Sequence, residues 1–418
     1  MVMNTVIAIP IFADTHRHPL HKDNYLSLIY VKPLGEESKM LTINHVDMMD
    51  QDDYTFLLNE QILTPSKKKM LSFIPTKNIY DMDLLNYYLY NKPINTEDIR
   101  INALEVMTSR YYKLNDVNTV IPLYKHQEWC DEVASQIESI WDLKDTINWD
   151  SYEEYNREAV LAYYSIERNG VPVSNDVVDI FDDRVIRHLS DRKLYSDYFL
   201  CTSAGRPSNS FGSVNFAALT PETRKAVTTR KTELIEFDYD AYHVRILGDI
   251  IGYDFPEGSV HEHFRSYYGE SVSYEDSKAM TFRYLYGTIP PEVAQLSTFF
   301  AKVSNLSNLF WKEFQDKGYA ETPIFKRRIL ASNFPDMTQN KLLNYIIQAT
   351  ETERNIKTII NIQRYLYKKQ TKLILYGYDS FLFDYDSTDG DHVLEDLRNI
   401  LEEDKFIVKM KRGTSYEF

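Results

Sequence analysis

The sequence predicts a mixed α/β protein with more than one domain. Short apolar runs that alternate with turn residues indicate strands, and longer segments with apolar residues three and four positions apart indicate helices. Hydrophobic residues make up 43% of the 418-residue chain, which is enough for sizeable cores, and this length suits two or three domains. We therefore expect an α/β or α+β fold.

The first part of the chain predicts a mixed α/β domain followed by long helices. The expected elements are strands at 6–9 and 25–31, a helix at 81–90, a helix and then a boundary between 128 and 149, and a helix at about 151–169. Gly170 supplies the stop for the last of these helices, because glycine readily ends a helix in a left-handed conformation.

The second part of the chain differs from the first in composition and in the order of its expected elements. A loop rich in Ser, Asn and Gly at 203–213 precedes an apolar strand at 233–239. Helices are expected at about 241–252 and 277–287, and residues 372–385 have the pattern of a β-hairpin with Asp379 at its tip.

The charge of the chain is acidic on average but unevenly distributed. The formal net charge is -15, which argues against a simple basic nucleic-acid binder. Residues 128–154 contain nine acids and one base, whereas residues 317–372 contain eleven bases and four acids. The second segment can form a basic groove or only a solvated helical face.

The two cysteines and the N-terminus point to a soluble protein of a reducing compartment. Cys130 and Cys201 are far apart and lack metal-ligand spacing, which excludes a disulfide scaffold. The apolar run at 6–12 is too short to span a bilayer, and no basic region precedes it. We expect a cytoplasmic protein without a membrane partner.

Two apolar strands each end in an acid. Asp238 ends the strand at 233–239, and Asp379 follows a second apolar strand 141 residues later. If the strands pair in one sheet, the two carboxylates lie close together, which is unfavourable unless a cation offsets their charges. Two Mg²⁺ ions at such a pair would suit phosphoryl transfer, although acids at strand ends are common in proteins without metals.

A helix between these strands carries a second pattern. Lys278, Phe282 and Tyr286 follow one another at intervals of four, so they lie on one helix face. A cation and two aromatic rings in a row suit a triphosphate, a base and a sugar, but they also suit ordinary packing.

The order of these features resembles the family A (bacterial DNA polymerase I) enzymes. Asp238-Tyr239 with residues 244–247 resembles motif A, Lys278-x3-Phe282-x3-Tyr286-Gly287 resembles motif B, and residues 376–383 resemble motif C. The segments at 158–171, 204–216, 326–328 and 344–350 resemble further family segments in the same order.

The resemblance implies a fold, a reaction and roles for individual residues. The fold would be a right-hand polymerase palm and fingers with an N-terminal ribonuclease-H-like, exonuclease-type domain, and the substrates would be primer–template DNA and dNTPs. The cofactor would be two Mg²⁺ ions, which Mn²⁺ can replace. Metal binding would fall to Asp238, Asp379 and the backbone of Tyr239; dNTP binding to Lys278, Phe282, Tyr286, His261, His243 and Arg283; and DNA binding to Arg206, Asn215, Arg245, Asn344, Gln348 and Tyr378. The division would be an exonuclease-like domain at 1–145, a connector and reduced thumb at 146–204, and palm and fingers at 205–418, with fingers at about 255–335.

Three positions depart from the family pattern. His243 stands where the family places the Glu that excludes a ribose hydroxyl, and Tyr274 stands where it places a triphosphate-binding Arg. Ser380 replaces the Glu that follows the motif C aspartate. These departures leave open a sugar-tolerant or ribonucleotide-using polymerase, or a replisome subunit with weakened catalysis.

Two further expectations concern the N-terminal part and the thumb. Asp14 stands in a D-x-E-like segment with His16 in place of the Glu, Asp81 to Leu85 resembles a later exonuclease segment, and Tyr124 and Glu128 resemble Y-x3-D, so we expect no proofreading. The short interval between Val173 and Gly205 indicates a reduced thumb, weak grip on DNA and a partner protein that supplies processivity. The compact size and the Asn/Lys/Tyr-rich composition lead us to expect a phage or other viral replication enzyme.

Overall fold

The chain folds into two compact units. The computed structural model describes residues 4–14, 17–44, 52–95, 123–181, 183–209, 214–269, 271–403 and 405–418. The N-terminal unit comprises Met1–Cys201, Ser208–Thr228 and Ser415–Glu417, and the C-terminal unit comprises Thr202–Pro207, Thr229–Thr414 and Phe418. The structure thus groups the predicted connector with the N-terminal part of the chain. The three-part division stays a prediction.

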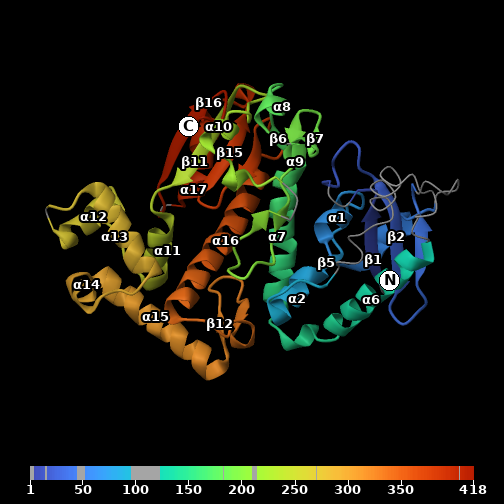
Figure 1. The fold of residues 1–418 in the computed structure, drawn as a ribbon, viewed down its shortest axis with the longest axis horizontal. Helices are drawn as coiled ribbons and strands as arrows, with labels where there is room; N and C mark the ends of the chain where they lie inside the picture. The colour runs from blue at the N-terminus through green and yellow to red at the C-terminus, as the bar shows by residue number, and fades with distance from the viewer. Residues whose placement is uncertain are drawn as a thin grey trace. The chain divides into compact units, whose positions relative to one another are not determined.

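The N-terminal unit is built on a five-stranded mixed sheet (Figure 1). Its main elements are β1 (Thr5–Phe12), β2 (Leu26–Pro33), β3 (Lys39–Thr42), β4 (Gln61–Thr64), α1 (Lys67–Leu71), β5 (Ile79–Asp81), α2 (Met82–Tyr90), α6 (Leu123–Trp141) and α7 (Trp149–Asn169). The strand order is β3-β2-β1-β4-β5, antiparallel on the β2 side of β1 and parallel on the β4 side. This mixed sheet agrees with the expected ribonuclease-H-like arrangement.

The local sequence explains why these elements form. Residues of β1 from Val6 to Phe12 are all buried, so the strand forms the centre of the sheet. Helix α7 begins where the side chain of Asn148 accepts a hydrogen bond from the backbone of Ser151, and it ends at Gly170 with φ 65°. The predicted strands at 6–9 and 25–31 and the helices at 81–90 and 151–169 are therefore confirmed.

The rest of the N-terminal unit consists of short elements. They are β6 (Val171–Pro172), α8 (Val177–Ile180), α9 (Asp183–Ile186), β7 (Leu189–Ser190), β8 (Lys193–Leu194), β9 (Tyr198–Phe199), β10 (Ser208–Asn209) and α10 (Pro221–Arg224). Backbone hydrogen bonds tie these segments into small sheets, with β6-β8-β7 in one and β9-β10 in another. No helix longer than four residues occurs between Val171 and Arg224 in the part that the structure describes.

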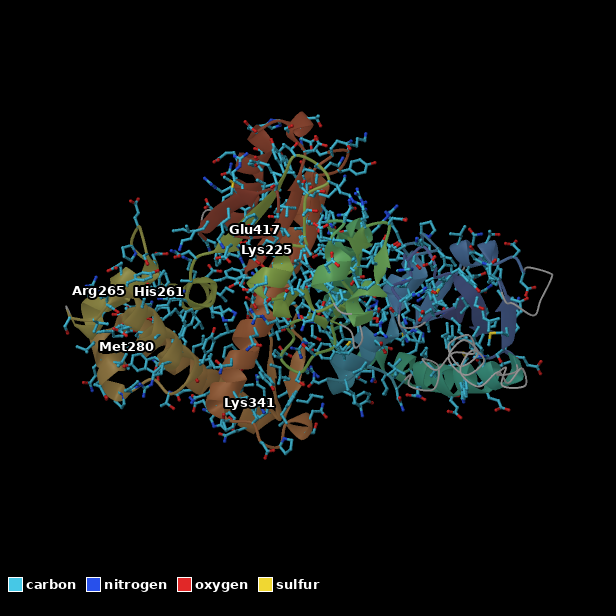
Figure 2. The ribbon with its side chains drawn as sticks, turned by 45° about the horizontal axis from the view of Figure 1, so that its top comes forward. Lys225, His261, Arg265, Met280, Lys341 and Glu417 are labelled. Carbon is cyan, nitrogen blue, oxygen red and sulfur yellow. The ribbon has the colours of Figure 1, made fainter. Side chains whose placement is uncertain are left out.

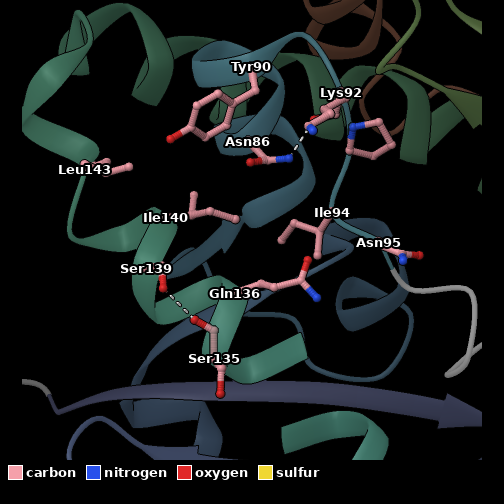
Figure 3. Close-up of a pocket in the computed structure, with 11 residues that line it drawn as sticks. Asn86, Tyr90, Lys92, Ile94, Asn95, Ser135, Gln136, Ser139, Ile140 and Leu143 are labelled. Carbon is pink, nitrogen blue, oxygen red and sulfur yellow. Dashed lines mark hydrogen bonds between the residues drawn. The ribbon is translucent and has the colours of Figure 1, made fainter. Parts of the chain in front are cut away.

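A cavity lies in the N-terminal unit between α2, the segment that follows it, and α6 (Figure 3). Its volume is about 730 Å³, and Tyr90, Ile94 and Leu143 are among the side chains that line it. The side-chain amide of Asn86 donates to the carbonyl of Lys92 across 2.9 Å at its edge. The described residues around it include no acid, histidine or cysteine.

The C-terminal unit combines a four-stranded antiparallel sheet with long helices (Figure 1). Its elements are β11 (Glu233–Tyr239), α11 (Tyr242–Ile251), α12 (Val260–Tyr268), α13 (Tyr274–Tyr286), α14 (Pro291–Leu296), α15 (Thr298–Lys317), β12 (Tyr319–Glu321), β13 (Arg328–Leu330), α16 (Gln339–Tyr365), β14 (Lys372–Tyr376), β15 (Ser380–Tyr385), α17 (His392–Glu402) and β16 (Val408–Gly413). The sheet order is β14-β15-β11-β16. The strand at 233–239, both helices and the hairpin predicted in this part of the chain are confirmed.

The long helices have clear start signals and a shared core. The side chain of Ser273 caps α13 by accepting from Asp276, and Thr338 caps α16 by accepting from Lys341. Helices α12 and α13 lie side by side, and Figure 2 labels His261 and Arg265 on α12 and Met280 on α13. Aromatic residues on α12 and α15, including Phe264, form the core that joins these helices to α11 and α16.

Candidate active site

The end of β11 and the turn between β14 and β15 bring Asp238 and Asp379 together. Strand β11 pairs with β15, the returning strand of the hairpin, and Asp238 lies opposite Ser380 in this register. The backbone N–H of Tyr239 donates to the carbonyl of Asp379 across 2.8 Å. The two predicted carboxylates therefore come from neighbouring chain segments at the same end of the paired strands.

The electrostatics of this pair differ from those of ordinary surface acids. Burial, together with the charges of Asp379 and Glu236, raises the pKa of Asp238 to about 6. Burial and the charge of Glu351 raise the pKa of Asp379. Lys411 and Lys409 on β16 act in the opposite direction on Asp238. Ionisation of both carboxyl groups is therefore unfavourable, and a bound cation would reduce the free-energy cost.

The donor types at this pair fit a divalent metal. Mg²⁺ usually binds through one or two carboxylates together with waters and substrate phosphates, rather than within a complete protein cage. The described residues include no cluster of three or more His, Cys, Asp or Glu that could hold a metal ion. Asp238 and Asp379 can supply two such carboxylates.

The residue before Asp379 has an unusual backbone conformation. Tyr378 has a positive φ of 72°, which is rare for an aromatic residue. Its carbonyl accepts a hydrogen bond from the side-chain amide of Asn355, 2.7 Å away. The guanidinium of Arg206 lies over its ring, 4.1 Å from the ring centre. The tip of the hairpin is therefore held from two sides.

Arg206 reaches this place because Gly205 lets two backbones approach. Gly205 has a φ of 75°, and a Cβ atom there would lie 3.2 Å from the Cβ of Ala349 and 2.6 Å from a guanidinium nitrogen of Arg327. A larger residue would push the segment at 202–207 away from α16. Glycine at this position thus explains the Ala-Gly-Arg order of the sequence.

A buried carboxylate on α16 joins several of the predicted residues. Glu351 is fully buried and pairs with Arg206, with Nε to Oε2 at 2.8 Å and Nη2 to Oε1 at 3.1 Å. The Nε2 atom of His243 lies 3.2 Å from Oε1 of Glu351, close enough for attraction but off the line of a good hydrogen bond. The Nδ1 atom of His243 is 2.6 Å from the hydroxyl of Tyr286.

The face of α13 carries the residues predicted for the nucleotide. Lys278 is exposed and makes no hydrogen bond or ion pair with another described residue. The rings of Phe282 and Tyr286 stack with centres 5.8 Å apart and planes 6° from parallel. Burial, with the charge of Glu351, raises the pKa of Tyr286 to about 12, so its hydroxyl stays protonated at neutral pH.

His261 lies next to this face. It is 2% exposed, and its ring contacts Phe282 and Tyr274 with centres 5.6 Å and 5.9 Å away. Its Nδ1 atom is buried without a hydrogen-bond partner among the described residues. Burial lowers the pKa of His261, and the charge of Lys278 acts in the same direction. An unpaired ring nitrogen beside an exposed lysine suits an anionic group of a ligand.

The other predicted site residues have different surroundings. Arg283 is exposed on α13, Gln348 is half-buried on α16, and the side-chain amide of Asn344 donates to the carbonyl of Tyr286 across 3.2 Å. Asn215 belongs to the N-terminal unit and accepts a hydrogen bond from Asn209. These placements leave the predicted DNA contacts of Asn215, Asn344 and Gln348 as predictions.

Arg245 is the most buried of the residues predicted to bind DNA. Its side chain is buried, and Nε donates to the carbonyl of Asp240 across 3.0 Å while Nη2 donates to the carbonyl of Gly258 across 3.3 Å. Its Nη2 atom also lies 3.6 Å from the carboxylate of Asp240. These contacts fasten the segment after α11 to the turn after β11, and the DNA contact of Arg245 stays a prediction.

Sequence reasoning missed three residues of this site. Two of them lie on α16 at helical spacing from predicted residues: Glu351 is seven positions after Asn344, and Asn355 is seven positions after Gln348. This spacing could have indicated that they share a helix face. Lys409 lies opposite Asp238 on β16, and its Nζ is 2.6 Å from the carboxylate of Asp240. No local pattern indicated Lys409, because Lys409 lies 171 positions after Asp238 and meets it only through the pairing of β11 with β16.

The N-terminal unit has a second group of acids around a cavity of about 460 Å³. Asp81 accepts hydrogen bonds from the backbones of Lys67 at 2.8 Å and Leu84 at 3.0 Å, and Asp14 pairs with Arg17 at 3.3 Å. The Nζ atom of Lys68 lies 3.0 Å from Asp197, another acid in the wall of this cavity. Groups of the protein itself thus satisfy these acids. His16 lies outside the described residues.

Comparisons with known proteins identify the fold. The structure is similar to the POL domain of Pol1 from M. smegmatis, which was solved in complex with DNA primer-template and dNTP. The TM-score is 0.72 over 100% of this chain and 96% of that chain, with 12% sequence identity. No protein-family model matches the chain, and no curated protein matches it in sequence. The fold is therefore that of a DNA polymerase domain, which the sequence alone predicted.

The helices were also compared with the requirements of a bilayer. Within the described ranges, no helix is both long enough and apolar enough to cross a membrane.

Proposed function

We propose that this chain is a template-directed DNA polymerase that adds dNTPs to a primer 3′-OH. The observation that carries the proposal is the pairing of Asp238 and Asp379 across β11 and the β14–β15 hairpin, in a fold shared with a DNA polymerase domain. Two adjacent carboxylates are ligands of the kind that metal-assisted phosphoryl transfer uses.

Asp238, Asp379 and the backbone carbonyl of Tyr239 would hold two Mg²⁺ ions, which Mn²⁺ can replace. When bound, these ions supply positive charge to the attacking and leaving oxygens of the phosphoryl transfer. The chain's own contribution is to hold the two carboxylates in register, which the backbone hydrogen bond between Tyr239 and Asp379 supports.

The nucleotide would lie along α13. Lys278 has a free ammonium for the triphosphate, and the unpaired ring nitrogen of His261 offers a second contact. The stacked rings of Phe282 and Tyr286 would flank the base and the sugar, with His243 behind Tyr286. Arg283 is exposed on the same helix and would add charge near the triphosphate.

Primer–template DNA would contact a second group of residues. Arg206 and Tyr378, stacked beside Asp379, would face the primer end, and Asn344 and Gln348 on α16 would contact the template side. Asn215 would add a contact from the N-terminal unit. The basic segment at 317–372 would attract the phosphate backbone.

We further propose that the N-terminal unit does not proofread. The hydrogen bonds that Asp81 accepts from two backbone N–H groups, and the pairing of Asp14 with Arg17, support this, because a two-metal nuclease needs carboxylates that are free to bind cations. Release of mononucleotides from a mismatched primer end, abolished by Asp14→Ala, would contradict it.

A partner protein that supplies processivity is the third part of the proposal. It is motivated by the short elements between Val171 and Arg224, which offer little helical surface for holding a duplex. Processive synthesis by the purified chain alone at physiological salt would overturn this part.

Two other functions have specific observations in their favour. His243 in place of the family's Glu favours a sugar-tolerant or ribonucleotide-using polymerase, and Tyr274 and Ser380 favour a replisome subunit with weakened catalysis. The exposed Lys278 and the two paired aspartates argue against the second of these.

Primer extension with Mg²⁺ tests the proposal directly. We expect extension with dNTPs, and a loss on the order of 10³-fold in Asp379→Ala, because removal of a metal-binding carboxylate forfeits several kcal/mol of charge stabilisation. Equal use of rNTPs would favour the sugar-tolerant function. No extension at low salt with excess primer–template would favour the weakened subunit.

A further inference from the structure

We infer that Glu351 is a positioning residue which fixes Tyr286 through His243 and so sets the discrimination between deoxyribose and ribose. The inference rests on the proposed function and deepens it. His243 occupies the position where the family has a Glu, so this position has no carboxylate here. Glu351 on α16 would supply one from another part of the chain.

Glu351 lies where a carboxylate would not be retained for packing alone. It is fully buried, and a buried carboxylate is unfavourable unless charged or hydrogen-bonding partners surround it. Two groups do so: the guanidinium of Arg206, with Nε at 2.8 Å from Oε2, and Nε2 of His243, at 3.2 Å from Oε1. The carboxylate thus faces both the residue stacked on Tyr378 and the residue behind Tyr286.

The carboxylate decides how His243 presents its second nitrogen. The carboxylate of Glu351, which is paired with Arg206, lies 3.2 Å from Nε2 of His243, so its charge favours a hydrogen on that nitrogen over a lone pair although the two do not form a well-aligned hydrogen bond. In the neutral ring, a hydrogen on Nε2 leaves Nδ1 as an acceptor. Nδ1 is 2.6 Å from the hydroxyl of Tyr286, which must then be the donor.

This contact fixes the position of the Tyr286 ring. The ring is held edge-to-face against His243, with centres 5.9 Å apart and planes at 83°, and stacked against Phe282 on the other side. It is nevertheless 38% exposed, so part of the ring remains open to a ligand. His243 and Phe282 thus hold the Tyr286 ring in place, and its exposed part can exclude the additional hydroxyl group of a ribose.

A carboxylate at position 243 on α11 should be able to replace the one at position 351 on α16. The double substitution His243→Glu with Glu351→Ala would place a carboxylate beside the Tyr286 hydroxyl. The surroundings of Arg206 would still contain one acid. The double variant should therefore regain what Glu351→Ala loses. A residue that only stabilised α16 would not be replaced by an acid on α11.

A matched control lies on the same helix. Glu353 is also buried, but it accepts hydrogen bonds from the backbones of Ile324 and Phe325 and has no contact with His243 or Arg206 among the described residues. Glu353→Gln removes a buried charge from α16 and should lower the Tm without changing sugar discrimination.

The experiment measures equilibrium binding of dATP and ATP to the full chain with Mg²⁺ and a dideoxy-terminated primer–template, and kcat/KM for both nucleotides on an extendable primer. The variants are Glu351→Gln, Glu351→Ala, His243→Glu with Glu351→Ala, and Glu353→Gln. We expect the dATP-to-ATP preference to fall about tenfold in both Glu351 variants, the effect of losing one charge-assisted contact, and to recover in the double variant.

Each outcome bears on a different statement. Equal losses for both nucleotides in Glu351→Gln, or an unchanged preference, would overturn the role of Glu351 while wild-type extension upholds the proposed function. A similar change of preference in Glu353→Gln would also overturn it, because the effect would then be general to α16. A wild-type chain that neither binds nor incorporates either nucleotide would overturn the proposed function and the inference together.

Discussion

The side-chain amide of Asn355 donates a hydrogen bond to the carbonyl of Tyr378, 2.7 Å away. Asn355 is fully buried on α16 and also donates to the hydroxyl of Tyr376 across 2.9 Å. Tyr378 is the left-handed residue that precedes Asp379, and such a conformation persists only where neighbouring groups hold it. One amide on a helix thus supports the turn that presents the carboxylate of Asp379.

Asn355→Asp tests this support by removing the two donors while keeping a side chain of the same size. We expect a loss of stability of about 2–3 kcal/mol and a fall in kcat for primer extension with little change in the KM for dNTP, because the hairpin tip loses its position. Steady-state kinetics and thermal unfolding measure both. A stable variant with normal kcat would show that the turn holds Asp379 without Asn355.

Asp238→Asn should stabilise the protein at neutral pH when divalent cations are absent. The folded-state pKa of Asp238, about 6, lies above its usual value of 3.8, so the folded chain binds the proton more tightly. The resulting unfavourable contribution is fully present above about pH 6 and vanishes below about pH 4. Solvent screening of this half-buried group reduces the gain to about 1 kcal/mol at pH 7.5.

Thermal unfolding in EDTA at pH 7.5 and pH 4.5 provides the measurement for Asp238→Asn. The Tm of the variant should exceed that of the wild type by about 1–3 °C at pH 7.5, and the two values should converge at pH 4.5. A variant less stable than the wild type at pH 7.5 would contradict the assignment of a strained, ionised carboxyl.

Mg²⁺ or Mn²⁺ should raise the Tm of the wild-type chain, because a ligand that binds only the folded state stabilises it by mass action. The increase should disappear in Asp379→Asn, which removes one of the two ionised carboxylates. Titration of the metal by differential scanning fluorimetry, with EDTA as the reversal, measures the effect. An equal increase in the variant would locate metal binding elsewhere.

Lys278→Ala should weaken nucleotide binding far more than Arg283→Ala. Both residues are exposed on α13, but Lys278 shares the helix face of Phe282 and Tyr286 and raises the positive charge near His261. Loss of one charge-assisted phosphate contact predicts a fall in kcat/KM for dNTP of about 10- to 100-fold. Equal effects of the two substitutions would mean that the triphosphate lies along another face of the helix.

Asp81→Ala should act on stability and not on any nuclease activity. Asp81 is 6% exposed and caps α2 while it accepts from the backbone of Lys67, so its loss leaves two buried donors without partners. We expect a cost of about 2–3 kcal/mol in unfolding free energy and unchanged primer extension at low temperature. Detection of 3′-end degradation that disappears in this variant would reveal a working nuclease.

The parts of the site that the sequence could predict are those with a local pattern. The strand at 233–239, the hairpin around Asp379 and the helix with Lys278 each have a periodic apolar face and an end signal, and each occurs as predicted. Proximity of Asp238 to Asp379 followed from the expectation that their strands belong to one sheet. Here the detail differed, because β11 pairs with β15 and not with β14.

The parts that the sequence could not predict depend on contacts between distant segments. Arg245 has the charge of a DNA contact, and only its burial beneath Asp240 and Gly258 shows its structural task. Glu351 lies close to a predicted segment, but its importance follows from Arg206, which is 145 positions away. Buried ion pairs of this kind leave no periodic signal in a single sequence.

The position of β16 in the chain has a consequence for the timing of synthesis. This strand, Val408–Gly413, is the neighbour of β11 on the side opposite β15, and it places Lys409 across from Asp238. A ribosome that has made β11, α13 and the β14–β15 hairpin has still not made the strand that completes the sheet. Until Gly413 has left the ribosome, β11 exposes an unpaired edge. A nascent chain should therefore need protection there, and the carboxylate of Asp238 should acquire its final surroundings only after β16 has joined the sheet.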